Sequence, residues 1–252
     1  MILKKFGLQN QIAVVTGGSR GLGRAIAQAL AEAGADIAVV SRSSSPELEK
    51  DICGLGRRYC HISADLTQRE QTRKVIPAVA EKLGDVTILV NNAGIIRRAS
   101  AREYPEHDWD ATLEVDLSAA FILSQAAGRT MLNAGRGKII NVASVIAFQG
   151  GLNVSAYSVA KHGMAGLTKA LANDWARHGI NVNAVAPGFF RTELTQSLQK
   201  DPVRSQAITA RIPAGRWGTP EDLAGAVVFL ASAAADFVHG VVLPVDGGWM
   251  AW

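Results

Sequence analysis

The chain has 252 residues, with 26 Lys and Arg against 22 Asp and Glu and a formal net charge of +4. Apolar residues make up 48% of the chain and charged residues 19%, which excludes a disordered chain and indicates a globular protein. No dense run of Lys and Arg accompanies the small basic excess, so we expect no nucleic-acid partner.

Cysteine, histidine and hydropathy patterns narrow the class further. Cys53 and Cys60 are too few for a disulfide scaffold or a four-cysteine zinc site, and the five His residues show no ligand spacing. No run of 18 apolar residues occurs, and polar residues 9–11 stand where a signal peptide would have its apolar core. We therefore expect no metal, no membrane partner and a cytoplasmic location.

Short β-branched apolar runs alternate along the chain with longer Ala- and Leu-rich amphipathic stretches. Most of the short runs are continuously apolar, as in parallel strands that are covered on both faces. Seven strands are predicted, over residues 12–15, 37–40, 58–62, 87–90, 138–142, 181–185 and 241–243. Six helices are predicted, over residues 21–33, 47–55, 68–83, 108–132, 155–178 and 220–232.

Strict alternation of strands and helices indicates βαβ units with right-handed crossovers. The expected fold class is therefore α/β, a Rossmann fold with a doubly wound seven-stranded parallel sheet and helices on both faces. The elements use the whole length, so we expect one domain over residues 1–252. The least regular segment, residues 187–217, is expected to be an irregular loop that acts as a lid.

The turn after the first predicted strand is rich in glycine. Gly17 can make the tight turn, Gly21 lets the backbone approach a phosphate, and Gly23 lets the helix pack closely on the sheet. The N–H groups of the helix N-terminus would then face a pyrophosphate. A glycine cluster can also be a simple βα turn, but its position before an Ala-rich helix indicates dinucleotide binding. The expected contacts are Gly17, Ser19, Arg20, Gly21, Leu22 and Gly23.

The end of the second predicted strand bears on the choice between NAD and NADP. An acid there would bind the adenosine ribose of NAD, but Ser41 and Arg42 occupy the position. Arg42 and Arg20 could bind a 2′-phosphate by charge-assisted hydrogen bonds, or both could be solvated loop arginines.

Two further strand ends carry candidate cofactor contacts. Asp65 and Leu66 follow the third predicted strand, where a carboxylate can accept a hydrogen bond from the adenine amine. Asn92, Ala93 and Gly94 follow the fourth and would line the nicotinamide half of the cofactor. Asn is also a common turn residue, so neither motif decides the matter alone.

A serine, a tyrosine and a lysine form the candidate catalytic group. Ser144 follows the fifth predicted strand, and Tyr157 and Lys161 are an i,i+4 pair on one face of a predicted helix. A lysine ammonium favours the phenolate and lowers the pKa of a neighbouring tyrosine. Tyr157 could then take the proton of an alcohol as hydride leaves the carbon, while Ser144 hydrogen-bonds to the same oxygen. A surface Tyr–Lys pair is the alternative.

These motifs, taken in order, resemble the short-chain dehydrogenase/reductase family over essentially the whole chain. The matching stretches are residues 16–23, residues 91–94, the group Ser144, Tyr157 and Lys161, and Pro187-Gly188 with Thr192. The resemblance implies a seven-stranded Rossmann sheet, usually assembled as a homotetramer.

The resemblance also implies roles for individual residues. Tyr157 would be the acid/base, Ser144 would orient the carbonyl, and Lys161 would bind the nicotinamide ribose and tune Tyr157. Thr192 would contact the carboxamide. The expected contacts on the nicotinamide side are thus Tyr157, Lys161, Pro187, Gly188 and Thr192.

One position departs from the family pattern. The family commonly has Asn in the long helix before the fifth strand, where it holds a water that links the lysine to solvent. Asp116 occupies that place here. Asp keeps an acceptor oxygen but adds charge near Lys161, so we expect Lys161 to be held more strongly as a cation. Asp116 is counted with the catalytic candidates.

Residues 92–98, 149–151, 211–217 and 244–250 resemble the sugar-acid branch of the family. This implies an oxidoreductase that interconverts a hydroxyl and a keto group on a small sugar acid of the gluconate type. Arg97 is expected to pair with the substrate carboxylate, with Arg98 solvated and Gln149 as a further substrate contact. That branch often uses NAD, whereas Arg20 and Arg42 favour NADP, so we expect NAD(P)(H) with a slight preference for NADP(H).

Two alternatives stay open. Reduction of a 3-oxoacyl thioester, or of another carbonyl, shares the fold and motifs, although it would want a basic patch for an acidic carrier. A catalytically silent dinucleotide-binding scaffold is the alternative from another class, and the intact Ser144, Tyr157 and Lys161 set argues against it.

The tail over residues 245–252 contains Trp249 and Trp252. Large aromatics that are exposed at a terminus tend to mark an interface, so we expect a tetramer with Trp249 or Trp252 buried between subunits. The alternative is a tail that folds back on its own core.

Overall fold

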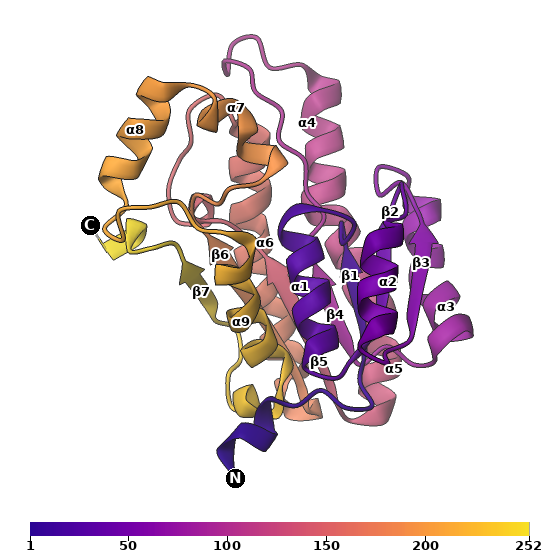
Figure 1. Cartoon of the computed structure of the whole chain (residues 1–252). Coiled ribbons are helices and arrows are strands. Elements are labelled where there is room, and N and C mark those ends of the chain that lie inside the picture. The colour runs from indigo at the N-terminus through magenta and orange to yellow at the C-terminus, as the bar shows by residue number, and fades with distance from the viewer. Residues whose placement is uncertain (252) are drawn as a thin grey trace.

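The computed structural model describes residues 1–251, in which seven strands form one parallel sheet (Figure 1). The strands are β1 Ile12–Thr16, β2 Asp36–Ser41, β3 Tyr59–Ser63, β4 Ile88–Asn91, β5 Gly137–Val142, β6 Ile180–Pro187 and β7 Val242–Val245. Their order is β3-β2-β1-β4-β5-β6-β7, so the winding direction reverses between β1 and β4. This is the doubly wound Rossmann order, which confirms the predicted fold class and puts the ligand crevice at the carboxyl ends of these strands.

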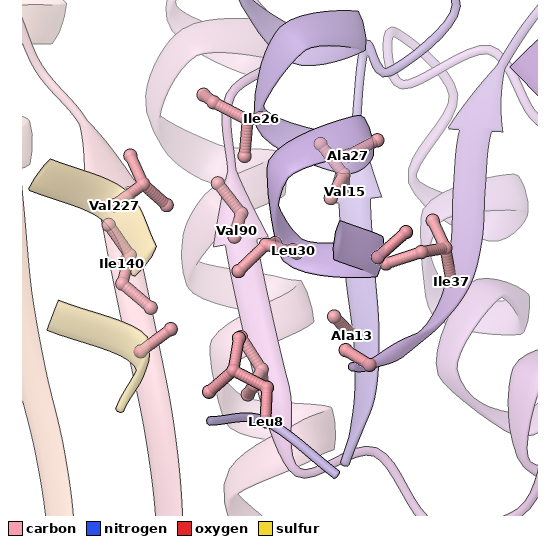
Figure 2. Close-up of a cluster of buried hydrophobic side chains, with 14 of the residues drawn as sticks. Leu8, Ala13, Val15, Ile26, Ala27, Leu30, Ile37, Val90, Ile140 and Val227 are labelled. Carbon is pink, nitrogen blue, oxygen red and sulfur yellow. The ribbon is translucent and has the colours of Figure 1, made fainter. Parts of the chain in front are cut away.

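Two helical layers cover the sheet. The helices are α1 Gly21–Glu32, α2 Pro46–Gly54, α3 Arg69–Leu83, α4 Glu106–Leu113, α5 Ala119–Ala134, α6 Ser155–Trp175, α7 Gln196–Gln199, α8 Pro202–Arg211 and α9 Pro220–Ala231. Side chains of α1, α2 and α9 pack on one face of the sheet, and those of α3, α5 and α6 on the other. Figure 2 shows the first face, where Ile26 and Leu30 of α1 point onto Val15 and Val90.

The continuously apolar strand sequences follow from this double cover. Successive side chains of a strand point to opposite faces. Val14 accordingly belongs to one apolar cluster while Ala13 and Val15 belong to the other, and all three are fully buried. A strand buried on both faces needs apolar residues at every position, which is the pattern that predicted a parallel sheet.

The single helix predicted over residues 108–132 is wrong in one respect. The helix is interrupted at Glu114–Ser118, where a π-helical turn separates α4 from α5. A π turn holds one residue more than an α turn, so the apolar period shifts by a single position, too little to show in the sequence pattern. Such turns occur often at functional sites, and this one contains the buried Asp116.

Residues 187–217 are also more regular than expected, because they contain α7 and α8. The start of α8 carries ordinary capping signals: the Asp201 carboxylate accepts a hydrogen bond from the Arg204 N–H at 3.0 Å, and Pro202 is the first helical residue. Figure 1 shows α7 and α8 above the carboxyl ends of β6 and β7. The segment therefore lies where a lid would lie, but it is helical.

The C-terminal tail packs on its own chain. Trp249 is buried, and its ring lies 4.7 Å from that of Phe189 between ring centroids. The Arg211 guanidinium of α8 stacks on Trp249 at 3.9 Å, within cation–π distance. The expectation that Trp249 needs a second subunit for its burial is wrong, because the tail folds back as in the alternative. Trp252 lies outside the described residues. Among residues 1–251, no helix is long and apolar enough to cross a membrane.

Truncation of the tail aromatic tests this packing. Trp249→Ala should lower the free energy of unfolding by about 3–5 kcal/mol, the usual cost of removing a buried large aromatic. Denaturant unfolding at a fixed protein concentration measures the loss. Val203→Ala on α8, where the native side chain is 79% exposed, is the control and should change stability little. Equal losses in the two variants would contradict the burial of Trp249.

Candidate active site

The glycine turn between β1 and α1 is built for close approach to an anion. Gly17 and Gly21 have φ of 65° and 54°, the left-handed region that favours glycine. A Cβ at Gly23 would lie 2.3 Å from the Gly17 carbonyl oxygen, so only glycine fits there. The side chain of the N-cap residue Arg20 makes no hydrogen bond to the first turn of α1. The first N–H groups of α1 are therefore available to a pyrophosphate, as a dinucleotide requires.

Hydrogen bonds join this turn to the loop after β4. The Thr16 hydroxyl oxygen accepts from the N–H groups of Asn92 and Ala93, each at 2.9 Å. The Asn92 amide nitrogen donates in return to the Thr16 carbonyl at 2.8 Å. Because both loops follow neighbouring strands at the topological switch point, these bonds hold the two walls of the expected cofactor crevice at a fixed separation.

The structure brings Ser144, Tyr157 and Lys161 together at the end of β5. Ser144 caps the 3-10 turn Val145–Ala147, and its hydroxyl oxygen accepts from the Ile146 N–H at 3.2 Å. The buried Lys161 ammonium donates to the Val142 carbonyl at 2.9 Å and lies 5.4 Å from the centroid of the half-buried Tyr157 ring. A substrate oxygen between Ser144 and Tyr157 would face a proton donor beside a fixed cation.

Asp116 completes this group from the π turn. Its Oδ2 lies 3.3 Å from the Lys161 Nζ, and its Oδ1 accepts from the Ile95 N–H at 2.7 Å. Asp116 is fully buried and Lys161 is 3% exposed, so the ion pair lies in the protein interior. Burial raises the pKa of Asp116, and the Lys161 cation and the Ile95 N–H oppose that shift by favouring the charged carboxylate. The acidic group expected near Lys161 is thus in direct contact with it.

The pKa of Tyr157 differs from the sequence prediction. Burial raises it above the ordinary value, Lys161 lowers it as expected, and the Asp116 carboxylate raises it again, with the net result that it is raised. Loss of hydration lowers the pKa of Lys161, but Asp116 and Tyr157 outweigh that effect and raise it. Lys161 is therefore held as a cation, and Tyr157 is held as a neutral phenol.

Arg97 and Arg98 have different surroundings. The Arg97 Nε is 3.4 Å from Asp108 Oδ1 on α4. Arg98 makes no ion pair within residues 1–251, and its charge is close enough to lower the pKa of Tyr157. Loss of hydration and the neighbouring charge of Arg204 on α8 lower the pKa of Arg98 itself. Arg98 is therefore the arginine whose charge acts on the reactive phenol, and the substrate contact predicted for Arg97 stays a prediction.

The two arginines that were expected at a 2′-phosphate differ in their ion pairs. The Arg20 Nη1 is 2.6 Å from Glu193 Oε2, which places Arg20 beside the segment that follows β6. Arg42 is exposed after β2 and has no ion pair within the described chain. His61 of β3 lies beside Ser41, with its Nε2 3.1 Å from the Ser41 carbonyl oxygen.

The other expected cofactor contacts lie around the same crevice. A Cβ at Gly21 would lie 3.8 Å from the Thr192 side chain, so the segment after β6 covers the glycine turn. The Asp65 carboxylate accepts from the Thr67 N–H and hydroxyl at 3.0 and 2.9 Å. Gln149 is half-buried just after the 3-10 turn that Ser144 caps. The remaining expected contacts lie at or after the ends of β1, β3, β4 and β6 in the chain: Ser19, Leu22, Leu66, Gly94, Pro187 and Gly188.

No group of three His, Cys, Asp or Glu side chains among residues 1–251 could hold a metal ion. The sheet order, the glycine turn and the Ser144, Tyr157 and Lys161 group are those of a Rossmann-type oxidoreductase. The family model described as Enoyl-(Acyl carrier protein) reductase matches residues 17–250. The chain belongs to the short-chain dehydrogenase/reductase family, as the motifs indicated.

Three relatives show what the chain is similar to. The 2-dehydro-3-deoxy-D-gluconate 5-dehydrogenase of Escherichia coli is 46% identical, and the match covers all of both chains. The 3-oxoacyl-acyl-carrier-protein reductase of Vibrio cholerae is 40% identical over 96% of this chain and 98% of that protein. A crystal structure of a gluconate 5-dehydrogenase from Burkholderia cenocepacia, in complex with NADP and tartrate, is 40% identical with a TM-score of 0.96 over all of both chains.

Removal of one hydroxyl tests the catalytic group. Tyr157→Phe keeps the ring and removes the proton-transfer oxygen, so turnover should fall by about 10²- to 10⁴-fold while cofactor binding is kept. Steady-state kinetics and cofactor titration measure the two effects. Tyr104→Phe is the matched control, because the Tyr104 hydroxyl donates to the Arg97 carbonyl at 3.2 Å, outside the catalytic group. Near-normal turnover in Tyr157→Phe would remove Tyr157 from the mechanism.

Proposed function

We propose that the chain is an NADP(H)-dependent dehydrogenase that interconverts a hydroxyl and a keto group on a small sugar acid of the 2-dehydro-3-deoxy-D-gluconate or gluconate type. The observation that carries the proposal is the group of Ser144, Tyr157 and Lys161 at the end of β5, in a chain 46% identical to a 2-dehydro-3-deoxy-D-gluconate 5-dehydrogenase. The charge of Arg98 lowers the pKa of Tyr157, and the charge of Arg204 lowers the pKa of Arg98. Two guanidinium groups repel each other unless an anion joins them. The carboxylate of a sugar acid would be that anion, while the hydroxyl that reacts lies elsewhere on the same substrate.

The reaction needs a proton carrier and a hydride carrier. A bound NADP⁺ would supply the hydride acceptor for the alcohol carbon. In reduction the neutral Tyr157 phenol donates its proton to the carbonyl oxygen, and in oxidation the Tyr157 phenolate takes the hydroxyl proton; the raised pKa of Tyr157 favours the neutral form. Ser144 donates a hydrogen bond to the same oxygen, and Lys161 fixes positive charge beside the phenol. Arg98 and Gln149 orient the acid end of the substrate.

The proposed cofactor site follows the crevice. The glycine turn and the first turn of α1 hold the pyrophosphate, with Arg20 beside Glu193 on its outer side. Arg42 and Ser41 contact the 2′-phosphate, and the loop over residues 92–94 lines the nicotinamide half. The absence of an acid after β2 and the NADP in the Burkholderia cenocepacia structure support this choice of cofactor.

We also infer a single domain over residues 1–252, a homotetramer and a cytoplasmic location. The sheet draws strands from residue 12 to residue 245, which supports one domain. Exposed apolar side chains, among them Phe121 on α5 and Phe237 before β7, support contact between subunits. Cys53 and Cys60 are free thiols, which suits a reducing compartment.

A second candidate function has a specific observation in its favour. The family model carries an acyl-carrier-protein description, and the Vibrio cholerae relative is named as a 3-oxoacyl reductase. Purified protein should therefore be assayed with NADPH or NADP⁺ against a panel of sugar acids, their keto forms and a 3-oxoacyl thioester, by following the absorbance of the reduced nicotinamide. Turnover of the sugar acids at a higher kcat/KM than the thioester supports the proposal. Turnover of the thioester alone contradicts it, and binding of NADPH without any turnover would favour a silent scaffold.

The pair of neighbouring arginines tests the substrate contact. Arg98→Met should raise KM for the sugar acid by about 10- to 100-fold, because it removes one charge-assisted hydrogen bond to the carboxylate. Arg97→Met is the matched control, since Arg97 is paired with Asp108, and it should leave KM nearly unchanged. A large rise of KM in Arg97→Met, with little change in Arg98→Met, would show that Arg97 binds the substrate carboxylate.

The arginine after β2 tests the cofactor. Arg42→Ala should weaken NADPH binding by about 1.5–3 kcal/mol, the value of one charged contact, and should leave NADH binding unchanged. Fluorescence titration with both nucleotides measures the difference. Arg24→Ala, which removes an exposed arginine paired with Asp51 at 3.3 Å, is the control. An equal loss for NADPH and NADH would contradict the assignment of Arg42.

A further inference from the structure

Asp116 is an acidic residue in the protein interior, next to the catalytic group. It lies in the π turn Glu114–Ser118 and is fully buried. Taking an ionised carboxylate out of water is costly unless the charge is paired and hydrogen-bonded. A residue that only shaped this turn would not need a charge, so the carboxylate requires a physical explanation.

The two carboxylate oxygens have different partners. Oδ1 accepts from the Ile95 N–H at 2.7 Å, a contact that the oxygen of a neutral Asn would make equally well. Oδ2 has no hydrogen-bond partner within the described residues, and it lies 3.3 Å from the Lys161 ammonium. A Cβ at Gly94 would come within 2.8 Å of Oδ2, so the glycine leaves the space that this oxygen occupies. The charge of Asp116 is therefore directed at Lys161.

Tyr157 experiences a small set of charges. Lys161, on the same helix α6, lowers its pKa, and so does Arg98 from the loop after β4. The Ser144 hydroxyl, after β5, lowers it by hydrogen bonding, and Arg204 of α8 acts on Arg98. Among these groups Asp116 is the anion, and it raises the pKa of Tyr157. The anion and Lys161 thus act on the phenol in opposite directions.

We propose that Asp116 is a positioning residue that pairs with Lys161, offsets part of the field of that cation at Tyr157, and so sets the pH range in which Tyr157 exchanges protons with the substrate. This rests on the proposed function only in taking Tyr157 as the proton-transfer group. The ion pair across the π turn and α6 is specific to a carboxylate, because a neutral Asn cannot form it.

The direction of the effect follows from the charges. Asp116→Asn keeps an acceptor for the Ile95 N–H and removes the negative charge. The phenolate then loses a repelling neighbour, and the Lys161 cation, still bound to the Val142 carbonyl, is no longer offset. Both changes lower the pKa of Tyr157. Oxidation needs Tyr157 to accept a proton, so the rising limb of its pH profile should move to lower pH.

The decisive experiment compares two acids of the same π turn. The pH dependence of kcat/KM for sugar-acid oxidation is measured for the wild type, for Asp116→Asn and for Glu114→Gln. Glu114 is the matched control because it pairs with Arg69 at 2.9 Å, on α3 and away from Lys161. The profile should move to lower pH by about one unit in Asp116→Asn and should stay in place in Glu114→Gln. A profile that stays in place in Asp116→Asn, with only a loss of stability, would overturn the proposal.

A spectroscopic titration separates this inference from the proposed function. Phenolate absorbance is followed against pH in the full chain with NADP⁺, with and without Asp116→Asn, and the Tyr157 contribution is taken as the difference from the matching Tyr157→Phe protein. Burial raises the pKa of Tyr59 to about 12, so Tyr59 titrates late. A lower Tyr157 midpoint in Asp116→Asn supports the ion-pair role even if no sugar acid is turned over, and an unchanged midpoint overturns it. If Asp116→Asn does not fold, the smaller neutral variant Asp116→Ser should shift the midpoint in the same direction.

Discussion

The buried ammonium of Lys161 is the interaction on which the rest of the site depends. A cation in the protein interior needs partners, and Lys161 finds them in the Val142 carbonyl and the Asp116 carboxylate. These partners come from the end of β5 and from the π turn, two segments far apart in the sequence. Once they hold the ammonium, the phenol one helical turn earlier on α6 is placed at the crevice as well.

Buried polar contacts extend this arrangement across the sheet. The Asn91 amide nitrogen donates to the Asn141 side-chain oxygen at 2.9 Å, and the Asn141 amide donates to the Thr168 hydroxyl at 2.9 Å. This chain links β4, β5 and α6, while Thr16 and Asn92 link β1 to the loop after β4. Each bond joins two elements that carry a wall of the crevice. These two groups of hydrogen bonds therefore hold together the strands and the helix whose ends form the crevice.

The fold could be predicted from the sequence because its signals are local. A continuous apolar run predicts a strand that is buried on both faces. A group of glycines at the first βα turn predicts a close approach of the backbone to a cofactor. Ser144, Tyr157 and Lys161 could be found for the same reason, since one helical turn and one strand end bring them together. The doubly wound parallel sheet followed from the alternation of strands and helices, from handedness rules and from the family resemblance.

The features that the sequence did not predict depend on tertiary contacts. The π turn shifts the helical period by one residue, and the ion pair of Arg97 depends on the position of Asp108 on α4. The raised pKa of Tyr157 results from burial and from Asp116, neither of which a Tyr–Lys spacing reveals. From the sequence Trp249 was expected to be an exposed aromatic near the C-terminus, but Phe189 and Arg211 pack against it in the structure.

The most direct measurement is a crystal structure of the chain with NADP⁺ and a sugar acid that it oxidises slowly or not at all. The account predicts the reacting hydroxyl between Ser144 and Tyr157, the acid group on Arg98, and the 2′-phosphate on Arg42. A substrate carboxylate bound away from Arg98, or a hydroxyl out of reach of Tyr157, would contradict it.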